Sequence, residues 1–252
     1  MPAELVVRQA GFAPVKGMRH LALDAVDLDE QGAIGDRSYC LVDVDAARVL
    51  RTVQHPSLIS VVAQVEGDEL GLTLPTGESV VATAARTRRT ITCDYWGRPV
   101  DLELTDGPHA ALLSAWLGRG VLLAVAPRGG VVFGDPLTVV GTASLRELAR
   151  RTGEDTLADQ ASRFRATLVV ETDTPYVEDS WAGRDVVVGD ATVRIGGPVP
   201  RCAVVDHHPE TGAKDVRLLK ALVHERPTNR AGEPVLGVYA MCTRPGRVTV
   251  IR

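Results

Sequence analysis

The sequence lacks the short motifs by which many enzymes are recognised. No two cysteines are separated by only two residues, and no Gly-rich phosphate loop, His-Glu-x-x-His motif or Gly-x-Ser-x-Gly motif is present. These absences argue against a zinc ribbon, a redox dithiol, a nucleotide-binding loop and a hydrolase nucleophile. The four cysteines are also too widely spaced for a plant-type iron–sulfur cluster. They are Cys40, Cys93, Cys202 and Cys242.

Long apolar runs are missing as well. The longest, such as Val121–Ala126, have the length of a strand and not the roughly 18 residues of a membrane-spanning helix. The first residues do not form a basic segment followed by an apolar one, so no secretory signal is visible. We therefore expect a cytoplasmic protein with no membrane partner.

Lysine is scarce, since only Lys16, Lys214 and Lys220 are lysines among 28 basic residues. The net charge of −4 gives no indication of a nucleic-acid partner. Genome composition explains most of the arginine excess, yet a planar guanidinium binds phosphate through two hydrogen bonds. An anionic ligand would therefore find suitable donors.

The 252 residues are 45% hydrophobic and 24% charged, which is typical of a globular protein with a sizeable core. Short β-branched or alternating segments separated by glycine and proline predict many strands, among them 21–26, 58–65 and 202–206. Helical spacing of apolar residues predicts helices at about 108–117, 142–151 (with Thr142 or Ser144 as its cap) and 215–224. The predicted class is mainly β with a few helices (α+β), in two packed lobes. We place the domains at 1–105 and 106–252.

Cys202 follows a stiff segment, Pro198-Val-Pro-Arg, and precedes the turn Pro-Glu-Thr-Gly212. The adjacent Arg201 favours the thiolate, which is the form of cysteine that attacks electrophiles and binds metals. The local sequence alone favours a buried and inert cysteine over a reactive one. His207 and His208 suggest a metal site, but neighbouring residues on a strand point to opposite faces, so a solvated loop fits them better.

Arginines also stand at the ends of apolar strands. Arg37 precedes Ser-Tyr-Cys-Leu-Val, and Arg163 and Arg165 precede Ala-Thr-Leu-Val-Val. Such positions suit the binding of a multiply charged anion at the rim of a sheet, although surface arginines beside strands are common.

Taken in order, these stretches resemble proteins in which a molybdenum-cofactor sulfurase C-terminal (MOSC) domain follows an N-terminal β-barrel domain. The same pairing occurs in the mitochondrial amidoxime-reducing component and its bacterial relatives. The resemblance covers nearly the whole chain, and no single piece of it is decisive. The matching pieces are Pro14-Val-Lys16-Gly17, Gly35–Asp43, Gln54-His-Pro56, Thr142–Leu148, Arg163-Phe-Arg165, Glu178-Asp-Ser-Trp181, Arg201-Cys202 with Asp206 and Thr211-Gly212, and Pro245-Gly246.

The resemblance implies a role for particular residues. Cys202 stands at the position of the family's cysteine that ligates molybdenum or carries sulfur, and Asp206 matches an acid close to the metal; we take both as catalytic. Lys16, Arg37 and Arg165 fall where the family contacts the phosphate and pterin of the cofactor. The remaining cofactor-binding candidates are Thr167 (where the family usually has asparagine), Arg201 and Asp135.

The function implied is that of a molybdenum-cofactor-binding oxidoreductase that reduces N-hydroxylated small molecules with electrons from an external donor protein. One alternative is a sulfur carrier that holds a persulfide on Cys202. Another is a cofactor carrier or plain β-rich binding protein in which all four cysteines are buried. Because the candidate residues come from both halves of the chain, the site is expected between the lobes.

Overall fold

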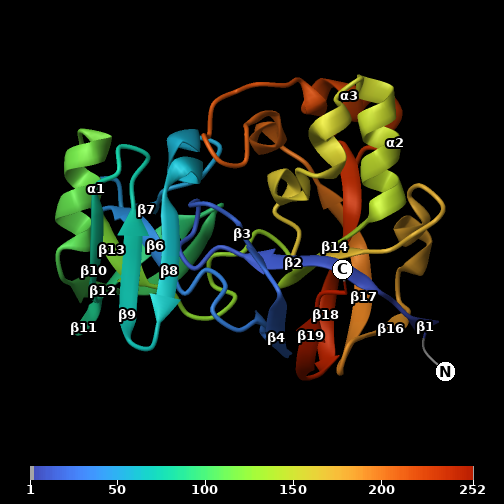
Figure 1. Ribbon diagram of the computed structural model, residues 1–252. Helices are drawn as coiled ribbons and strands as arrows, with labels where there is room; N and C mark the ends of the chain where they lie inside the picture. The colour runs from blue at the N-terminus through green and yellow to red at the C-terminus, as the bar shows by residue number, and fades with distance from the viewer. Residues whose placement is uncertain (1–2, 252) are drawn as a thin grey trace.

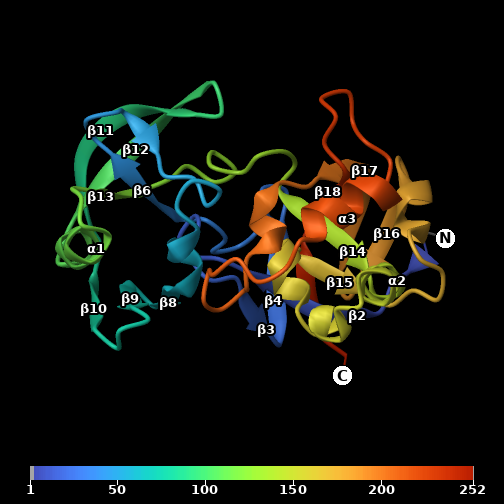
Figure 2. The same ribbon diagram turned by 90° about the horizontal axis from the view of Figure 1, so that it is seen from above.

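The computed structural model describes residues 3–251 and shows two lobes side by side. Figures 1 and 2 both separate a smaller lobe, which contains α1, from a larger lobe, which contains α2 and α3. Strands make up most of the regular structure in each lobe. The predicted class, mainly β with a few helices in two packed lobes, is confirmed. Within residues 3–251, no helix combines the length and the apolar character needed to cross a membrane.

A closed five-stranded barrel is the centre of the smaller lobe. In the order of their hydrogen bonding, its strands are β11 (Ala85–Tyr95), β12 (Arg98–Asp106), β13 (Leu122–Val125), β6 (Tyr39–Asp43) and β7 (Arg48–Val49). The lobe also contains a three-stranded sheet and a helix, namely β8 (Val62–Glu66), β9 (Glu69–Thr73), β10 (Ser79–Thr83) and α1 (His109–Leu117). Closure leaves the barrel without an exposed sheet edge. The N-terminal β-barrel that the sequence resemblance implies is therefore present.

The larger lobe is built on an eight-stranded sheet. Its strands, in spatial order, are β1 (Ala3–Glu4), β16 (Asp185–Val188), β17 (Ala191–Pro200), β18 (Val235–Arg244), β14 (Leu137–Gly141), β15 (Leu168–Val170), β2 (Val7–Phe12) and β3 (Leu21–Leu23). A smaller sheet contains β19 (Gly246–Thr249), β4 (Ala25–Asp29) and β5 (Gly32–Ala33). Alternate side chains from both sheets, such as Val26, Val193 and Val248, share one buried core.

The start of the chain is divided between the lobes. Strand β2 pairs with β15, and β4 pairs with β19, so both belong to the larger lobe. Between β2 and β3, however, Val15 and Met18 pack into the core of the smaller lobe. The loop that carries Lys16 therefore lies at the junction, and in space the lobes are not two consecutive halves of the sequence. The division at residues 105 and 106 remains a prediction.

The segment that follows Cys202 differs from the expected strand over 202–206. Strand β17 ends at Pro200, and residues 203–206 form a short 3-10 helix, in which the Val205 N–H donates to the Cys202 carbonyl at 3.2 Å. Cys202 is therefore the residue before a helical turn and not the first residue of a strand. The short 3-10 helices are η1 (Pro56–Ser60), η2 (Asp155–Ala158), η3 (Ala161–Phe164), η4 (Val177–Trp181) and η5 (Ala203–Asp206).

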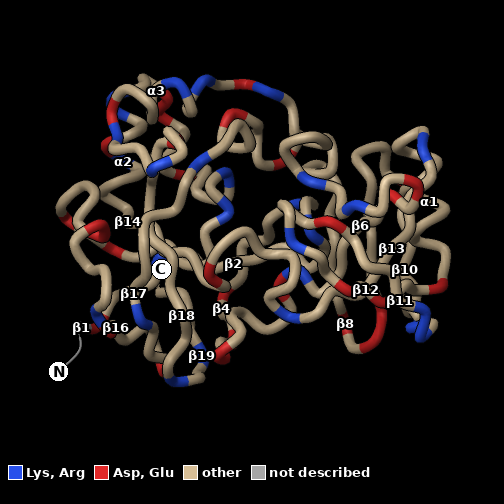
Figure 3. Tube along the Cα trace, turned by 180° about the vertical axis from the view of Figure 1, so that it is seen from behind, with Lys and Arg blue, Asp and Glu red and all other residues tan. Residues whose placement is uncertain are grey.

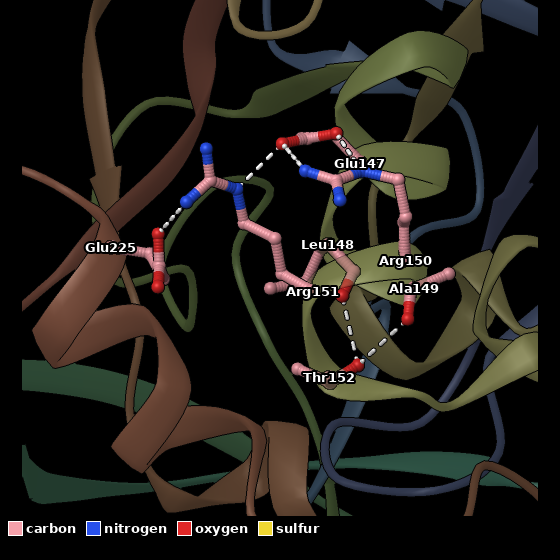
Figure 4. Close-up of polar contacts among 7 residues, drawn as sticks. All are labelled: Glu147, Leu148, Ala149, Arg150, Arg151, Thr152 and Glu225. Carbon is pink, nitrogen blue, oxygen red and sulfur yellow. Dashed lines mark hydrogen bonds and ion pairs between the residues drawn. The ribbon is translucent and has the colours of Figure 1, made fainter.

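Helices α2 (Thr142–Thr152) and α3 (Leu218–Glu225) lie together over the larger sheet (Figure 1). Leu145 and Leu148 of α2 share a buried cluster with Leu218 and Leu222 of α3. In Figure 4 the Arg151 side chain pairs with Glu147 of its own helix and with Glu225 of α3. Exposed ion pairs contribute little free energy, so the apolar cluster holds the helices together.

The N-terminus of α2 depends on a buried carboxylate. Glu178 has an exposed fraction of 0% and accepts hydrogen bonds from the Gly141 N–H at 3.1 Å and the Ser144 hydroxyl at 2.9 Å. A Cβ at position 141 would lie 2.8 Å from Glu178 Oε2, which explains the glycine. The expected capping by Thr142 or Ser144 is therefore wrong: Gly141 is the N-cap residue, its N–H donates to the Glu178 carboxylate from η4, and the Ala143 N–H donates to the Thr172 hydroxyl.

We expect Glu178→Gln to lower the free energy of unfolding by about 1–3 kcal/mol. The reason is that the NH2 group of the amide would face the Gly141 N–H or the Ser144 hydroxyl, which now donate to the carboxylate. Urea unfolding measures the change. The matched control is Glu171→Gln, which alters an exposed carboxylate paired with Arg8 and should cost less than about 1 kcal/mol. Equal small effects of the two changes would show that Glu178 does not anchor α2.

Candidate functional site

A cavity of about 180 Å³ opens where the two lobes meet. Lys16, Arg37, Arg165 and Cys202 all line it, so the structure brings together four predicted residues that are far apart in the sequence. Figure 3 shows basic positions on both sides of this junction. The predicted residues from both lobes therefore line one cavity.

Cys202 is the exposed cysteine of the chain. Cys40, Cys93 and Cys242 are buried in strands, and burial raises the pKa of the Cys40 thiol to about 12. Cys202 instead stands at the end of β17, where the chain turns into η5, and it lines the cavity. The interpretation in which all four cysteines are buried therefore does not hold for this chain.

Main-chain hydrogen bonds join the segment that carries Lys16 to the segment that carries Arg37. The Lys16 N–H donates to the Tyr39 carbonyl at 2.7 Å, and the Arg37 N–H donates to the Ala13 carbonyl at 2.8 Å. The Arg37 guanidinium also pairs with the neighbouring Asp36 carboxylate. These contacts fix two cations at the cavity from segments that lead into β3 and β6.

Arg165 brings a third cation from the larger lobe. It follows η3, and its Nη1 donates to the Met18 carbonyl at 2.8 Å, two residues beyond Lys16. This hydrogen bond joins residues 147 positions apart in the sequence. It therefore connects the two lobes at the cavity wall.

Backbone strain is concentrated at this cavity. Arg37 (φ 47°), Trp96 (φ 55°) and Arg165 (φ 52°) adopt left-handed conformations and line it. Such conformations cost roughly 1–3 kcal/mol for residues other than glycine, and they tend to occur at functional sites. The surrounding structure holds the two arginines in these positions despite that cost.

Each of the three cations makes the charged form of its neighbours less favourable. Removal from water, followed by the nearby charges of Arg37 and Arg165, lowers the pKa of Lys16 to about 7. Burial and Arg37 lower the pKa of Arg165 to about 10. The same two causes, burial first and then these arginines, hold the pKa of His20 well below its usual value. The cavity therefore has excess positive charge that an anion would neutralise.

Buried donors at the cavity point to the same ligand chemistry. Arg37 Nε and Arg165 Nη2 have no hydrogen-bond partner among residues 3–251. Buried N–H groups of this kind are rare in native proteins, and leaving one unsatisfied costs about 1–3 kcal/mol. An anion with several acceptor oxygens, such as a phosphate monoester, would satisfy both.

The side chain of Arg201 donates its hydrogen bonds to main-chain carbonyls. The Arg201 guanidinium donates to the Leu236 carbonyl (Nη2, 2.7 Å) and the Phe164 carbonyl (Nη1, 2.7 Å). It lines the cavity, but these bonds make it a positioning residue that ties the Cys202 segment to η3. The predicted direct contact of Arg201 with a cofactor has no support from its hydrogen bonds.

Asp206 is not among the residues that line the cavity. Its carboxylate is buried, accepts from the Leu219 N–H at 2.8 Å and lies 3.2 Å from the Lys214 ammonium. These contacts tie η5 to the first turn of α3. They give Asp206 a structural function in the loop after Cys202, which differs from the catalytic one that the resemblance implies.

Thr167 and Asp135 both line the cavity. Thr167 and Thr138 exchange hydrogen bonds, since each backbone N–H donates to the other's hydroxyl, at 3.1 and 3.2 Å. The Thr167 hydroxyl thus keeps its own proton available for a ligand. Asp135 supplies a negative charge near Tyr239 and makes the wall less uniformly basic.

Sequence reasoning missed the aromatic part of the lining. Tyr95, Trp96 and Phe133 all reach the cavity, and the Lys16 ammonium lies 5.4 Å from the centre of the Tyr95 ring. Tyr95 ends β11, Trp96 lies in the turn between β11 and β12, and Phe133 lies in the segment between β13 and β14. The only signal in the sequence is the unusual Tyr-Trp-Gly at a hairpin turn.

In the described part of the chain, 3–251, no three His, Cys, Asp or Glu side chains gather closely enough to hold a metal ion. A metal bound at Cys202 would therefore need most of its ligands from a cofactor. Soft sulfur ligands of a dithiolene, completed by one thiolate, match that requirement.

We expect binding of sulfate, a stand-in for a phosphate group, to weaken as the pH rises through 7. Below that pH Lys16 is already protonated, whereas above it the lysine must take up a proton from solvent when sulfate binds. The affinity should fall about tenfold between about pH 6 and about pH 8. Isothermal titration calorimetry measures the affinity.

Lys16→Arg is the matched control, since its charge does not titrate in this range. It should bind sulfate with a nearly flat pH profile. An unchanged decline in that variant would show that Lys16 is not the responsible group.

Comparisons with known proteins identify the domains of the chain. Residues 119–250 match the family model of the MOSC domain, and residues 6–119 match that of the MOSC N-terminal beta barrel domain. Over 101 residues, 40% of this chain, the sequence is 27% identical to a Drosophila mojavensis protein named molybdenum cofactor sulfurase. The matched part is 12% of that protein's length.

The solved structures that match have lower sequence identity to this chain. The YUAD protein from Bacillus subtilis is 10% identical, with a TM-score of 0.43, and the match covers 98% of this chain and 91% of that one. YiiM from Geobacillus stearothermophilus is 16% identical, with a TM-score of 0.31, over 45% and 50% of the two chains. The MOSC model alone spans more than half of the sequence. The protein belongs to the MOSC domain family and has the MOSC N-terminal beta barrel domain before its MOSC domain.

Proposed function

We propose that this protein binds a molybdenum cofactor in the cavity between its lobes and reduces N-hydroxylated small molecules. The observation that supports this most is one exposed thiol, Cys202, in a cavity with three incompletely neutralised cations. Membership of the MOSC family and the relative named molybdenum cofactor sulfurase are consistent with such a ligand. The proposed location is cytoplasmic.

The residues fit the two ends of such a cofactor. The thiolate of Cys202 would bind the molybdenum, because sulfur is a soft ligand. Lys16, Arg37 and Arg165 would hold the phosphate, and the unpartnered Nε of Arg37 and Nη2 of Arg165 are donors for its oxygens. Thr167 would contribute a hydroxyl, and Arg201 would keep the Cys202 segment in place.

When bound, the cofactor supplies two-electron oxygen-atom chemistry, and the protein supplies orientation and charge. In the net reaction, the N–O bond of the substrate breaks, and two electrons and two protons give the reduced nitrogen compound and water. Cys202 would hold the metal at the cavity wall. Because the four cysteines of this chain are dispersed, we propose that the electrons come from a separate donor protein.

A sulfur carrier with a persulfide on Cys202 is the second candidate. The exposure of this thiol favours it, since a persulfide must be reached by a donor and an acceptor enzyme. The basic cavity favours the cofactor, because a persulfide does not need three cations to hold a phosphate. We therefore rank the reductase first.

The test is expression in a host that makes the cofactor, followed by molybdenum analysis of the purified protein by mass spectrometry. We expect about one metal per chain, and loss of most of it in Cys202→Ala because the thiolate ligand is gone. Cys242→Ala is the matched control, since that thiol is buried in β18. Metal content that is the same in all three proteins would contradict the assignment of Cys202 as a ligand.

A second measurement separates the two candidates. The reductase should convert a hydroxamic acid to its amide with reduced viologen as an artificial electron donor, and the released pterin should be fluorescent. A sulfur carrier would instead have cyanolysable sulfur on Cys202 without molybdenum or pterin. That result would overturn the reductase and support the carrier.

A further inference from the structure

Two exposed aromatic rings meet at the cavity between the lobes. Trp96 and Phe133 form an edge-to-face pair, with ring centres 5.2 Å apart and an interplanar angle of 79°. Both line the same cavity as Cys202. Trp96 comes from the β11–β12 turn, and Phe133 from the segment between β13 and β14 that leads to the larger lobe. In Figure 2 this hairpin projects from the smaller lobe on the side of the larger one.

Core packing does not explain these rings. Trp96 is 42% exposed and Phe133 is 50% exposed, and no other Phe or Trp of residues 3–251 is exposed to this degree. In a chain in which aromatic residues make up only 4%, two solvent-facing rings in contact form an unusual apolar patch. Exposed apolar groups that adjoin a cavity mark binding sites.

The neighbouring residues hold the pair in place. The Arg51 guanidinium lies 4.4 Å from the centre of the Trp96 ring, and its Nε donates to Gln54 Oε1 at 3.1 Å. Arg98 Nη2 donates to the Val132 carbonyl at 2.5 Å, which fixes the residue before Phe133. Trp96 itself has a left-handed backbone (φ 55°). The rings are therefore positioned at some energetic cost.

Because the planes of the two rings are nearly perpendicular, the aromatic ring of a ligand can contact both of them at once. A planar aromatic group placed there stacks on one ring and meets the other edge-on, which are the preferred arrangements of aromatic pairs. An alkyl chain gains the apolar contact but not the ring–ring contribution. Both rings line the cavity that contains Cys202, which favours a small molecule as the occupant.

We propose that Trp96 and Phe133 determine the substrate preference of the protein, by binding the aromatic ring of an N-hydroxylated compound such as an aryl hydroxamic acid. The inference rests on the proposed function. The polar head group would extend from the rings toward Cys202 in the same cavity. In the reaction the N–O bond breaks, and the hydroxamic acid takes two electrons from the donor protein and two protons to give the aryl amide and water.

The primary test measures binding of 4-fluorobenzamide, the amide that such a reduction yields, by fluorine NMR on the protein as purified. The variants Trp96→Leu and Phe133→Leu keep an apolar side chain but remove a ring. Each should weaken binding roughly three- to tenfold, and acetamide should bind weakly to all forms. Val81→Ala is the matched control, since Val81 is exposed on β10 and does not line the cavity.

Kinetics with the molybdenum-loaded protein give the second readout. In the Leu variants, KM for 4-fluorobenzohydroxamic acid should rise by the same factor, while KM for acetohydroxamic acid and kcat for both stay unchanged. Thermal unfolding shows that each variant is folded. Unchanged amide binding and KM in both variants would overturn the inference, as would an effect only on the rate with the protein electron donor, which would assign the rings to docking.

The two proposals fail in different ways. Ring-dependent amide binding by a protein without molybdenum would retain the aromatic site and reject the reductase. A molybdenum-loaded, active protein whose Leu variants behave like the wild type would retain the reductase and reject the aromatic site.

Discussion

Mutual repulsion among Lys16, Arg37 and Arg165 is the constraint on which the site depends. Each comes from a different part of the chain, and Asp36 is the carboxylate that pairs directly with one of them. Burial, followed by the charges of Arg37 and Arg165, lowers the pKa of Lys16 to about 7. A protein that served only to bury apolar surface would gain nothing from the arrangement. The clustering of the three cations becomes favourable when an anion binds among them and neutralises their charge.

The fold brings these charges together by dividing the start of the chain between the lobes. The loop after β2 inserts Val15 and Met18 into the smaller core, so that Lys16 lies at the junction. The hydrogen bond from Arg165 to the Met18 carbonyl then closes the wall from the other side. Arg201 adds another link, because its guanidinium donates to the carbonyl of Phe164, the residue before Arg165, and so connects the Cys202 segment to it. Hydrogen bonds therefore connect the segment of the thiol to the segment of Arg165.

Part of this organisation was predictable from sequence. Alternating segments and glycine-rich turns predict the β-rich class, and the resemblance to the MOSC family brings residues 16, 37, 165 and 202 together. Two features required coordinates. The first is that the Arg201 guanidinium donates to main-chain carbonyls, and the second is that Asp206 ties η5 to α3. Both depend on contacts with other segments of the chain, which the local sequence does not show. The strand expected at 202–206 is a 3-10 helix for a local reason, since the proline-rich end of β17 stops the ladder at Pro200. The aromatic pair of Trp96 and Phe133 joins two turns, whose contact no local pattern reveals.

The most direct test of the account is the position of the metal. Crystals of the protein purified from a host that makes the cofactor can be measured at the molybdenum absorption edge, where an anomalous difference map locates that element. The account predicts one peak at bonding distance from Cys202 Sγ, with the phosphate of the cofactor against Lys16, Arg37 and Arg165. A peak elsewhere on the chain, or a phosphate bound away from these three cations, would contradict it.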